Sequence, residues 1–100
     1  MDTRIYEYFI EIARESSLSR AAENLYISQP ALSQRLKQLE EEIGTPLFDR
    51  SGNKLSLTKA GVIFLNGAQS IVYIKEQAYQ SIRALSGEAS NPPDASQPLP

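Results

Sequence analysis

The segment from Ser28 to Gly44 limits most strongly what this chain can fold into. Its apolar residues recur at spacings of three and four, which predicts a helix with one buried face, formed by Leu32, Leu36, Leu39 and Ile43. Pro30 does not break this helix. With Ser28 as the N-cap, the proline falls in the first turn, where its missing N–H would have had no partner within the helix. Because Gly44 can adopt the left-handed conformation that ends a helix, we predict a helix over residues 28–43.

The side of this helix opposite the leucines is short and polar, and it carries Pro30, Ser33, Gln34 and Lys37, with Gln29 at its edge. A glutamine amide can pair with adenine through two hydrogen bonds, and a serine hydroxyl can bond several base edges or a phosphate. A lysine can reach the phosphate backbone, and the free N–H groups of the helix start also favour phosphate. This face predicts a DNA recognition helix. The alternative is an ordinary polar surface helix that contacts nothing.

Two helices are expected before this one. The first should start at residue 2 or 3 and end at Glu15, with an apolar face formed by Ile5, Phe9, Ile12 and Ala13. A short second helix over residues 19–25 follows, with Ser19 as its N-cap. The small side chains of Ala21 and Ala22 would let this helix cross the next one closely. Two helices joined by one short turn in this way are typical of a helix-turn-helix.

The sequence after the third helix predicts a basic β-hairpin. Strand candidates at residues 47–50 and 55–57 flank Gly52 and Asn53, a pair that favours a tight turn. The cations of this hairpin lie near its tip, at Arg50 and Lys54. A basic hairpin by itself is more often a solvated turn. Beside a recognition helix it indicates a wing, which can reach the adjacent minor groove or the DNA backbone.

A long fourth helix should begin with Thr58 as its N-cap and continue to about residue 86. Its apolar residues follow a heptad seam that Lys75 interrupts: Phe64, Ala68, Ile71, Ala78, Ile82 and Leu85, widened by Ile63, Ile74 and Tyr79. So small a domain cannot cover the whole stripe, so we predict a homodimer. The alternative for the first turns, near Phe64 and Leu65, is packing onto the first helix. Two chains would place two recognition helices on an approximately palindromic operator.

Composition excludes several functional classes. The chain has no histidine and no cysteine, so we expect no metal site, no cofactor and no enzymatic activity. Residues 1–4 lack the apolar run of a signal peptide, and no apolar run could span a bilayer. We therefore expect a cytoplasmic, nucleoid-associated bacterial protein without a membrane partner. The net charge of −2 is a weak argument against nucleic acid, because position matters more than the sum. The run Glu40 to Glu42 is interpreted as a solvated helix end that points away from DNA.

The expected domain organisation has three parts. Residues 1–57 form a winged helix-turn-helix, with a three-helix core and a two-stranded wing, and residues 58–86 form a linker or dimerisation helix. Residues 87–100 hold four of the six prolines and little that could pack, which predicts a disordered tail.

Several motifs form one joint pattern: Phe9, Leu18 to Leu25, Ile27 to Ser33, Leu39 to Gly44, Pro46 to Phe48, Arg50, and Leu57 to Gly61. Over about residues 1–85 this pattern resembles one known family, the LysR-type transcriptional regulators. The resemblance is to the N-terminal DNA-binding domain. It implies a winged helix-turn-helix with a long linker helix that pairs two chains, and sequence-specific control of transcription, commonly as a tetramer in the full-length form. Family members continue into an effector-binding domain of two α/β lobes. Because nothing here could form that domain, the chain is interpreted as a fragment or a natural truncation, without a small-molecule ligand.

The resemblance also implies roles for individual residues. Those expected to face bases are Gln29, Pro30, Ser33 and Gln34, and Arg50 with the residues just after it would serve the wing. The expected phosphate and wing contacts are Ser28, Arg35, Lys37, Arg50, Asn53, Lys54 and Thr58. The expected dimer interface comprises Phe64, Ala68, Ile71, Ile74, Ala78, Ile82 and Leu85. The family often has arginine at position 34, where this chain has Gln34, so a changed base preference is expected, and Arg35 should reach a flanking phosphate or an acid.

The leading function predicted from the sequence is therefore a double-stranded DNA-binding regulator. The competing hypothesis is a winged helix used only for protein interaction, which would show no salt-dependent binding to duplex DNA.

Overall fold

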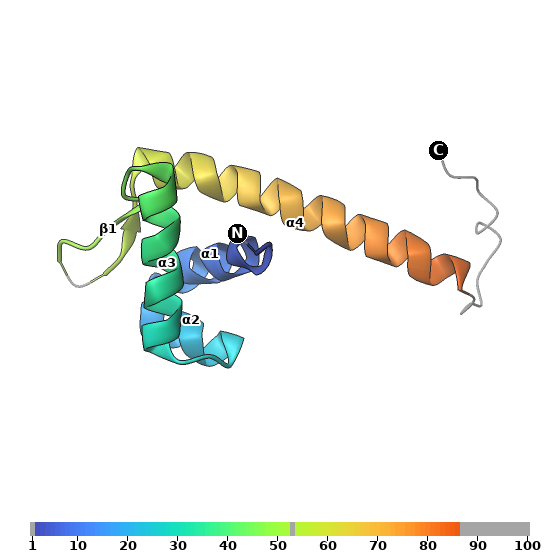
Figure 1. Ribbon diagram of the computed structural model, residues 1–100, viewed down its shortest axis with the longest axis horizontal. Coiled ribbons are helices and arrows are strands. Elements are labelled where there is room, and N and C mark those ends of the chain that lie inside the picture. Colours follow the sequence, from blue (N-terminus) through green and yellow to red (C-terminus); the bar gives the residue numbers. More distant parts are fainter. Residues whose placement is uncertain (1, 53, 87–100) are drawn as a thin grey trace.

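The computed structural model describes residues 2–52 and 54–86, and these form a mainly helical fold (Figure 1). The elements in chain order are α1 (Arg4–Glu15), α2 (Leu18–Leu25), α3 (Gln29–Ile43), β1 (Phe48–Asp49), β2 (Ser56–Leu57) and α4 (Lys59–Leu85). The predicted fold class, a three-helix core with a two-stranded wing and a long final helix, is confirmed. The tail predicted for residues 87–100 lies outside the described residues.

The core is built where α1, α2 and α3 meet the start of the wing. Phe9 is fully buried at its centre, and its ring centroid lies 5.0 Å from that of Phe48 and 4.8 Å from that of Phe64. One aromatic side chain of α1 therefore contacts both β1 and α4. From α3, Leu32 and Leu36 are buried as predicted. Ile43 is 43% exposed, so its assignment to the buried face was wrong, because the last turn of α3 extends past the core.

The ends of α2 and α3 are fixed by local hydrogen bonds. Ser28 is the N-cap of α3 and its Oγ accepts a hydrogen bond from the Ala31 N–H, with Pro30 in the first turn, as predicted. Gly44 has the expected left-handed backbone, with φ of 91°. The N-cap of α2 is Ser17, whose Oγ accepts from the Arg20 N–H at 3.1 Å. The prediction of Ser19 as this cap was wrong, because α2 already begins at Leu18.

The wing is an antiparallel pair in which Phe48 lies opposite Leu57 and Asp49 lies opposite Ser56. Its strands are shorter than predicted, since the first ends at Asp49 and the second begins at Ser56. The tight turn predicted at Gly52 and Asn53 includes a residue outside the described part of the chain. Asp49 accepts hydrogen bonds from the backbone N–H and the hydroxyl of Ser51, which lower the pKa of the Asp49 carboxyl.

The junction between the wing and α4 depends on close packing. Thr58 N–H donates to the Leu47 carbonyl at 3.1 Å, and Thr58 Oγ1 both donates to the Pro46 carbonyl and accepts from the Gly61 N–H. Thr58 is therefore the N-cap of α4, as predicted. Gly61 lies directly against Leu47, so that an added Cβ would overlap the Leu47 carbonyl oxygen. A side chain at residue 61 would push the start of α4 away from the wing.

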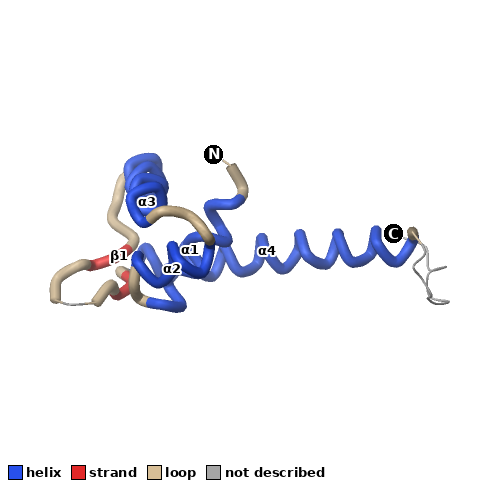
Figure 2. The backbone as a smooth tube through the Cα atoms, turned by 90° about the horizontal axis from the view of Figure 1, so that it is seen from below, coloured by secondary structure: helices blue, strands red, loops and turns tan. Residues whose placement is uncertain are grey.

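The long helix α4 packs on α1 through its first half and then leaves the body (Figures 1 and 2). The described chain is accordingly elongated, with extents of 53 × 25 × 21 Å. Phe64 stacks on Tyr6 with ring centroids 5.8 Å apart, and Ala68 is 1% exposed. Both positions contact the chain's own body. Ala68 has almost no exposed surface for a second copy, whereas Phe64 is half-buried and its predicted place in the dimer interface stays a prediction. No described helix has the length and apolar character needed to cross a membrane.

Lys75, the residue that interrupts the heptad seam, makes an ion pair with α1. Its Nζ lies 2.6 Å from Glu7 Oε2, and this hydrogen bond raises the pKa of Lys75. The ammonium also lies 5.5 Å from the centroid of the Tyr79 ring. The interruption is therefore explained, because the charge serves the contact between α1 and α4.

Candidate nucleic-acid interface

The polar face at the start of α3 is open to solvent. Gln29, Pro30 and Gln34 are exposed and Ser33 is half-buried. The Gln29 amide donates to Ser33 Oγ at 3.1 Å. This contact uses one N–H of the amide, so the second N–H, the amide oxygen and the serine hydroxyl hydrogen still have hydrogen-bonding capacity. The four residues predicted to face bases thus lie together on one uncovered surface.

Arg35 lies at the flank of α3 and is engaged by α1 and the residues before it. A guanidinium nitrogen is 3.6 Å from Asp2 Oδ2, and the guanidinium carbon is 5.2 Å from the centroid of the Tyr8 ring. Arg35 was predicted to reach either a phosphate or an acidic side chain. In the structure it contacts an acidic side chain, that of Asp2. Asp2 accepts hydrogen bonds from the Arg4 backbone N–H and guanidinium, which lower the pKa of Asp2 to about 2.

The remaining cations predicted to contact phosphate lie further along α3 and on the wing. Lys37 is exposed one turn further along α3, and Arg50 and Lys54 are exposed on the wing. A hollow of about 210 Å³ lies between the wing and the start of α2, lined by Ser16, Ser17, Leu18, Ser19, Arg50, Gly52, Lys54 and Leu55. The wing cations therefore lie beside the N-terminus of α2. The predicted contact Asn53 lies outside the described residues.

Two predicted phosphate ligands have structural partners in this conformation. The oxygens of Ser28 and Thr58 accept hydrogen bonds from helix N–H groups, so both side chains cap helices. Thr58 also donates its hydroxyl to the Pro46 carbonyl, which leaves it no free donor for a phosphate. The assignment of Thr58 as a phosphate contact is corrected for this reason. Ser28 keeps its hydroxyl hydrogen available.

Glu40 corrects the interpretation of the acidic run as a wholly solvated helix end. Its Oε2 accepts hydrogen bonds from the Leu47 N–H at 2.8 Å and from the Phe48 N–H at 3.3 Å. This carboxylate therefore fixes the start of the wing against the end of α3. Glu41 and Glu42 are exposed, as predicted.

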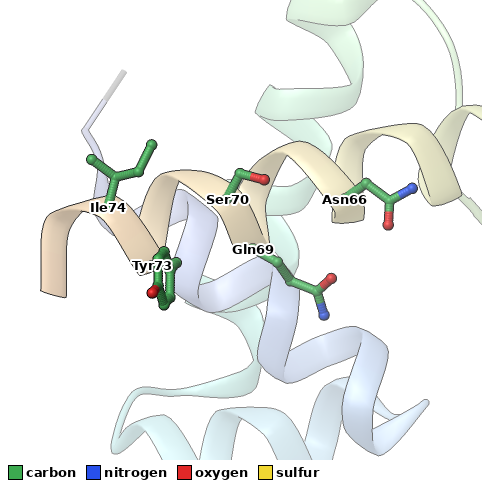
Figure 3. A pocket seen from close by; sticks show the side chains of 5 residues that line it. All are labelled: Asn66, Gln69, Ser70, Tyr73 and Ile74. Atoms are coloured by element: carbon green, nitrogen blue, oxygen red, sulfur yellow. The ribbon is translucent and has the colours of Figure 1, made fainter. Parts of the chain in front are cut away.

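The half of α4 beyond the body carries exposed apolar side chains. Ile74, Ile82 and Leu85 are 65%, 63% and 65% exposed, and Ile71 and Ala78 are also exposed. A hollow of about 630 Å³ along α4 is lined by Asn66, Gln69, Ser70, Tyr73 and Ile74. Figure 3 shows the side chains of these five residues. The described part of the chain leaves this surface without a covering element.

Comparison with known proteins decides the family. Residues 3–62 match the family described as bacterial regulatory helix-turn-helix protein, lysR family. The chain belongs to the LysR family. The match spans α1 to the start of α4 and includes the whole polar face of α3 and the wing.

Curated relatives support this membership in sequence. The chain is 45% identical over 85 residues to the HTH-type transcriptional regulator BudR of Klebsiella aerogenes. This alignment covers 85% of this chain and 59% of BudR. It is 43% identical over 91 residues to the HTH-type transcriptional regulator BsdA of Bacillus subtilis. This second alignment covers 90% of this chain and 31% of BsdA. This LysR-family chain thus spans less than two thirds of the length of these relatives.

Solved structures agree in fold. The structure of the BenM DNA-binding domain in complex with benA site 1 DNA is similar, with a TM-score of 0.82 and 29% identity over 89% of this chain and all of that one. A second DNA complex, that of Vibrio fischeri DarR, gives a TM-score of 0.78 and 32% identity over 86% of this chain and 30% of that one.

Three features of this LysR-family chain were not predicted from its sequence. Asn24 of α2 donates hydrogen bonds to Glu11 at 2.6 Å and to Glu15 at 2.9 Å, which joins α2 to α1. Tyr26, at the turn before α3, is 94% exposed with a left-handed φ of 59°. The third is the identity of the acid that Arg35 contacts, which is Asp2. The sequence does hint at the contact of Asn24, because Glu11 and Glu15 are one helical turn apart and so lie on the same face of α1.

Proposed function

We propose that this chain binds double-stranded DNA operators in a sequence-specific manner and regulates transcription as a dimer. The observation that carries the proposal is the uncovered polar face of α3, Gln29 to Gln34, in a fold that matches the whole BenM DNA-binding domain of a DNA complex. The expected domain division, residues 1–57 for DNA binding and 58–86 for dimerisation, is part of this proposal.

The chemistry of the open face suits the major groove. The amides of Gln29 and Gln34 offer a donor and an acceptor side by side, the pattern that pairs with adenine N7 and N6. Ser33 can donate to a base edge or accept from one. Pro30 presents a compact apolar ring in the first turn, which suits contact with a thymine methyl group. The N-terminus of α3 would thus point at base edges.

The cations would set the position of the domain on the duplex. Lys37 follows the open face by one turn, where it can reach a phosphate of the bound groove. Arg50 and Lys54 on the wing would contact the backbone or the adjacent minor groove. Glu40, by fixing the wing to α3, keeps these cations at a constant offset from the bases that α3 contacts. The negative net charge of the chain does not argue against DNA binding, because a bound duplex would respond mainly to the charges of the residues nearest to it.

Dimerisation would cover the exposed stripe of α4. Isoleucines and leucines that are more than 60% exposed at positions 74, 82 and 85 are best buried by the same stripe of a second copy, in a symmetric interface. Lys75 does not oppose this, because its charge is already paired with Glu7. The two recognition helices would then contact the half-sites of an approximately palindromic operator. The full-length form is proposed to assemble further into a tetramer, and the protein to act in the bacterial cytoplasm.

The alternative function, a winged helix that only binds protein, rests on the same fold and makes the opposite prediction for DNA. The test is selection of bound duplexes from a random pool, followed by affinity measurements between 50 mM and 200 mM salt. The proposal expects an enriched, roughly palindromic site and an affinity that falls steeply with salt. An unenriched pool together with no salt-dependent binding would favour the alternative.

A further inference from the structure

The recognition helix α3 has two flanks, and each is joined to a different part of the molecule. On one flank Glu40 holds the start of the wing through the backbone N–H groups of Leu47 and Phe48. On the other flank Arg35 contacts Asp2 and Tyr8. A helix in a major groove lies between two phosphate strands, so both flanks of α3 would face phosphates.

The flank opposite the wing holds a compact cluster of three charges. The Arg4 guanidinium lies 2.9 Å from Asp2 Oδ2, and the Arg35 guanidinium lies 3.6 Å from the same oxygen. The side chains of Arg4, Asp2 and Arg35 are 64%, 36% and 29% exposed. The Asp2 carboxylate is thus the shared partner of both arginines, and all three side chains are partly exposed to solvent.

We propose that Arg4 and Arg35 form a second phosphate-binding patch opposite the wing, and that Asp2 masks this patch and so sets the strength of DNA binding. The inference rests on the proposed function and adds a site and a residue that tunes it.

The physical basis is competition between two anions for the same donors. Arginine binds carboxylates and phosphates with the same planar fork of N–H groups, so Asp2 and a DNA phosphate compete directly. The stacking of Arg35 on Tyr8 keeps its guanidinium in place while its acidic partner changes. Because the cluster is at the surface, the exchange requires only side-chain rotation.

The test is Asp2→Asn in the full 100-residue chain. Asparagine keeps the oxygen that accepts the Arg4 backbone N–H, so the start of α1 is preserved. For a mixed-sequence DNA duplex, we expect an affinity higher by about two- to five-fold for each bound copy, the range for exposed ion pairs. The slope of log affinity against log salt should become steeper, by up to about 0.9 for each additional phosphate that is neutralised.

The control is Glu76→Gln, which removes the same charge from an exposed position of α4. It should change affinity and slope much less. A second test places Asp2→Asn in a chain that also carries Arg4→Met and Arg35→Met, where it should have no further effect.

Three results would overturn the inference: an unchanged or weaker affinity for Asp2→Asn, a gain equal to that of Glu76→Gln, or a gain that persists without the two arginines. A weaker affinity would mean that Asp2 positions the arginines for DNA. These outcomes are distinct from failure of the proposed function, in which the wild-type chain would show no salt-dependent binding to any duplex.

Discussion

Substitution of Gly61 by alanine tests the close contact that sets α4 against the wing. An added Cβ would lie 3.0 Å from Leu57 Cδ2 and 3.1 Å from the Leu47 carbonyl carbon, and closer still to the Leu47 oxygen. That oxygen also accepts the hydrogen bond from Thr58 N–H. A backbone carbonyl fixed by this bond cannot move aside easily, so either α4 shifts or the hydrogen bond is lost.

The expected magnitude follows from three terms. Overpacking costs about 1–3 kcal/mol, and loss of the hydrogen bond costs about 0.5–1.5 kcal/mol. Alanine gains about 0.8–1.0 kcal/mol over glycine as a helix former. The free energy of unfolding of Gly61→Ala should therefore fall by roughly 0.5–4 kcal/mol.

Gly67 of the same helix provides the matched control, because a Cβ there would meet no atom within 4 Å. Gly67→Ala should raise the free energy of unfolding by about 0.5–1 kcal/mol. Urea unfolding at one fixed protein concentration measures both, since a dimer's stability depends on concentration. If the two substitutions shift the midpoint in the same direction, the close contact at Gly61 does not limit the fold.

Three further substitutions test other parts of the account. Glu40→Ala removes the acceptor for two wing N–H groups and should cost about 1–3 kcal/mol of stability by urea unfolding, whereas Glu41→Ala, at an exposed neighbour, should cost less than about 0.5 kcal/mol; equal effects would refute the role of Glu40. Ile82→Glu lies on exposed α4 and should yield a folded monomer by light scattering, while a dimer would place the interface elsewhere. Lys54→Ala should weaken binding to all duplexes alike and reduce the salt slope by about 1, and an unchanged slope would remove Lys54 from the phosphate contacts.

Local capping and periodicity were enough to predict α3. Ser28, Pro30 and Gly44 act within a few residues of themselves, and each has the predicted place in the structure. The cap of α2 was missed by two residues because serines at 16, 17 and 19 give the sequence several equivalent candidates. The fold class followed from the order of the elements, and this was confirmed.

Contacts between distant residues were not predictable in the same way. Lys75 was seen only as an interruption of the heptad seam, because its partner Glu7 is 68 residues earlier in the chain. Glu40 was predicted to be solvated like its acidic neighbours Glu41 and Glu42. Its backbone donors come from the start of the wing at Leu47, which lies seven residues later in the chain. Phe64 and Ala68 fit the heptad pattern equally well whether they face a second copy or α1, so periodicity alone could not choose.

The central claim is that the polar face of α3 reads DNA bases, and Gln34 tests it most directly. Gln34 is exposed, and none of the hydrogen bonds among the described residues involves its side chain, so its removal leaves the fold intact. The measurement is the ratio of affinities for a selected operator and for a scrambled duplex of the same length, in wild-type chain and in Gln34→Ala. We predict a loss of about 1–3 kcal/mol on the operator alone, so that the ratio falls. An equal loss on both duplexes, or no loss on either, would contradict base reading by this face.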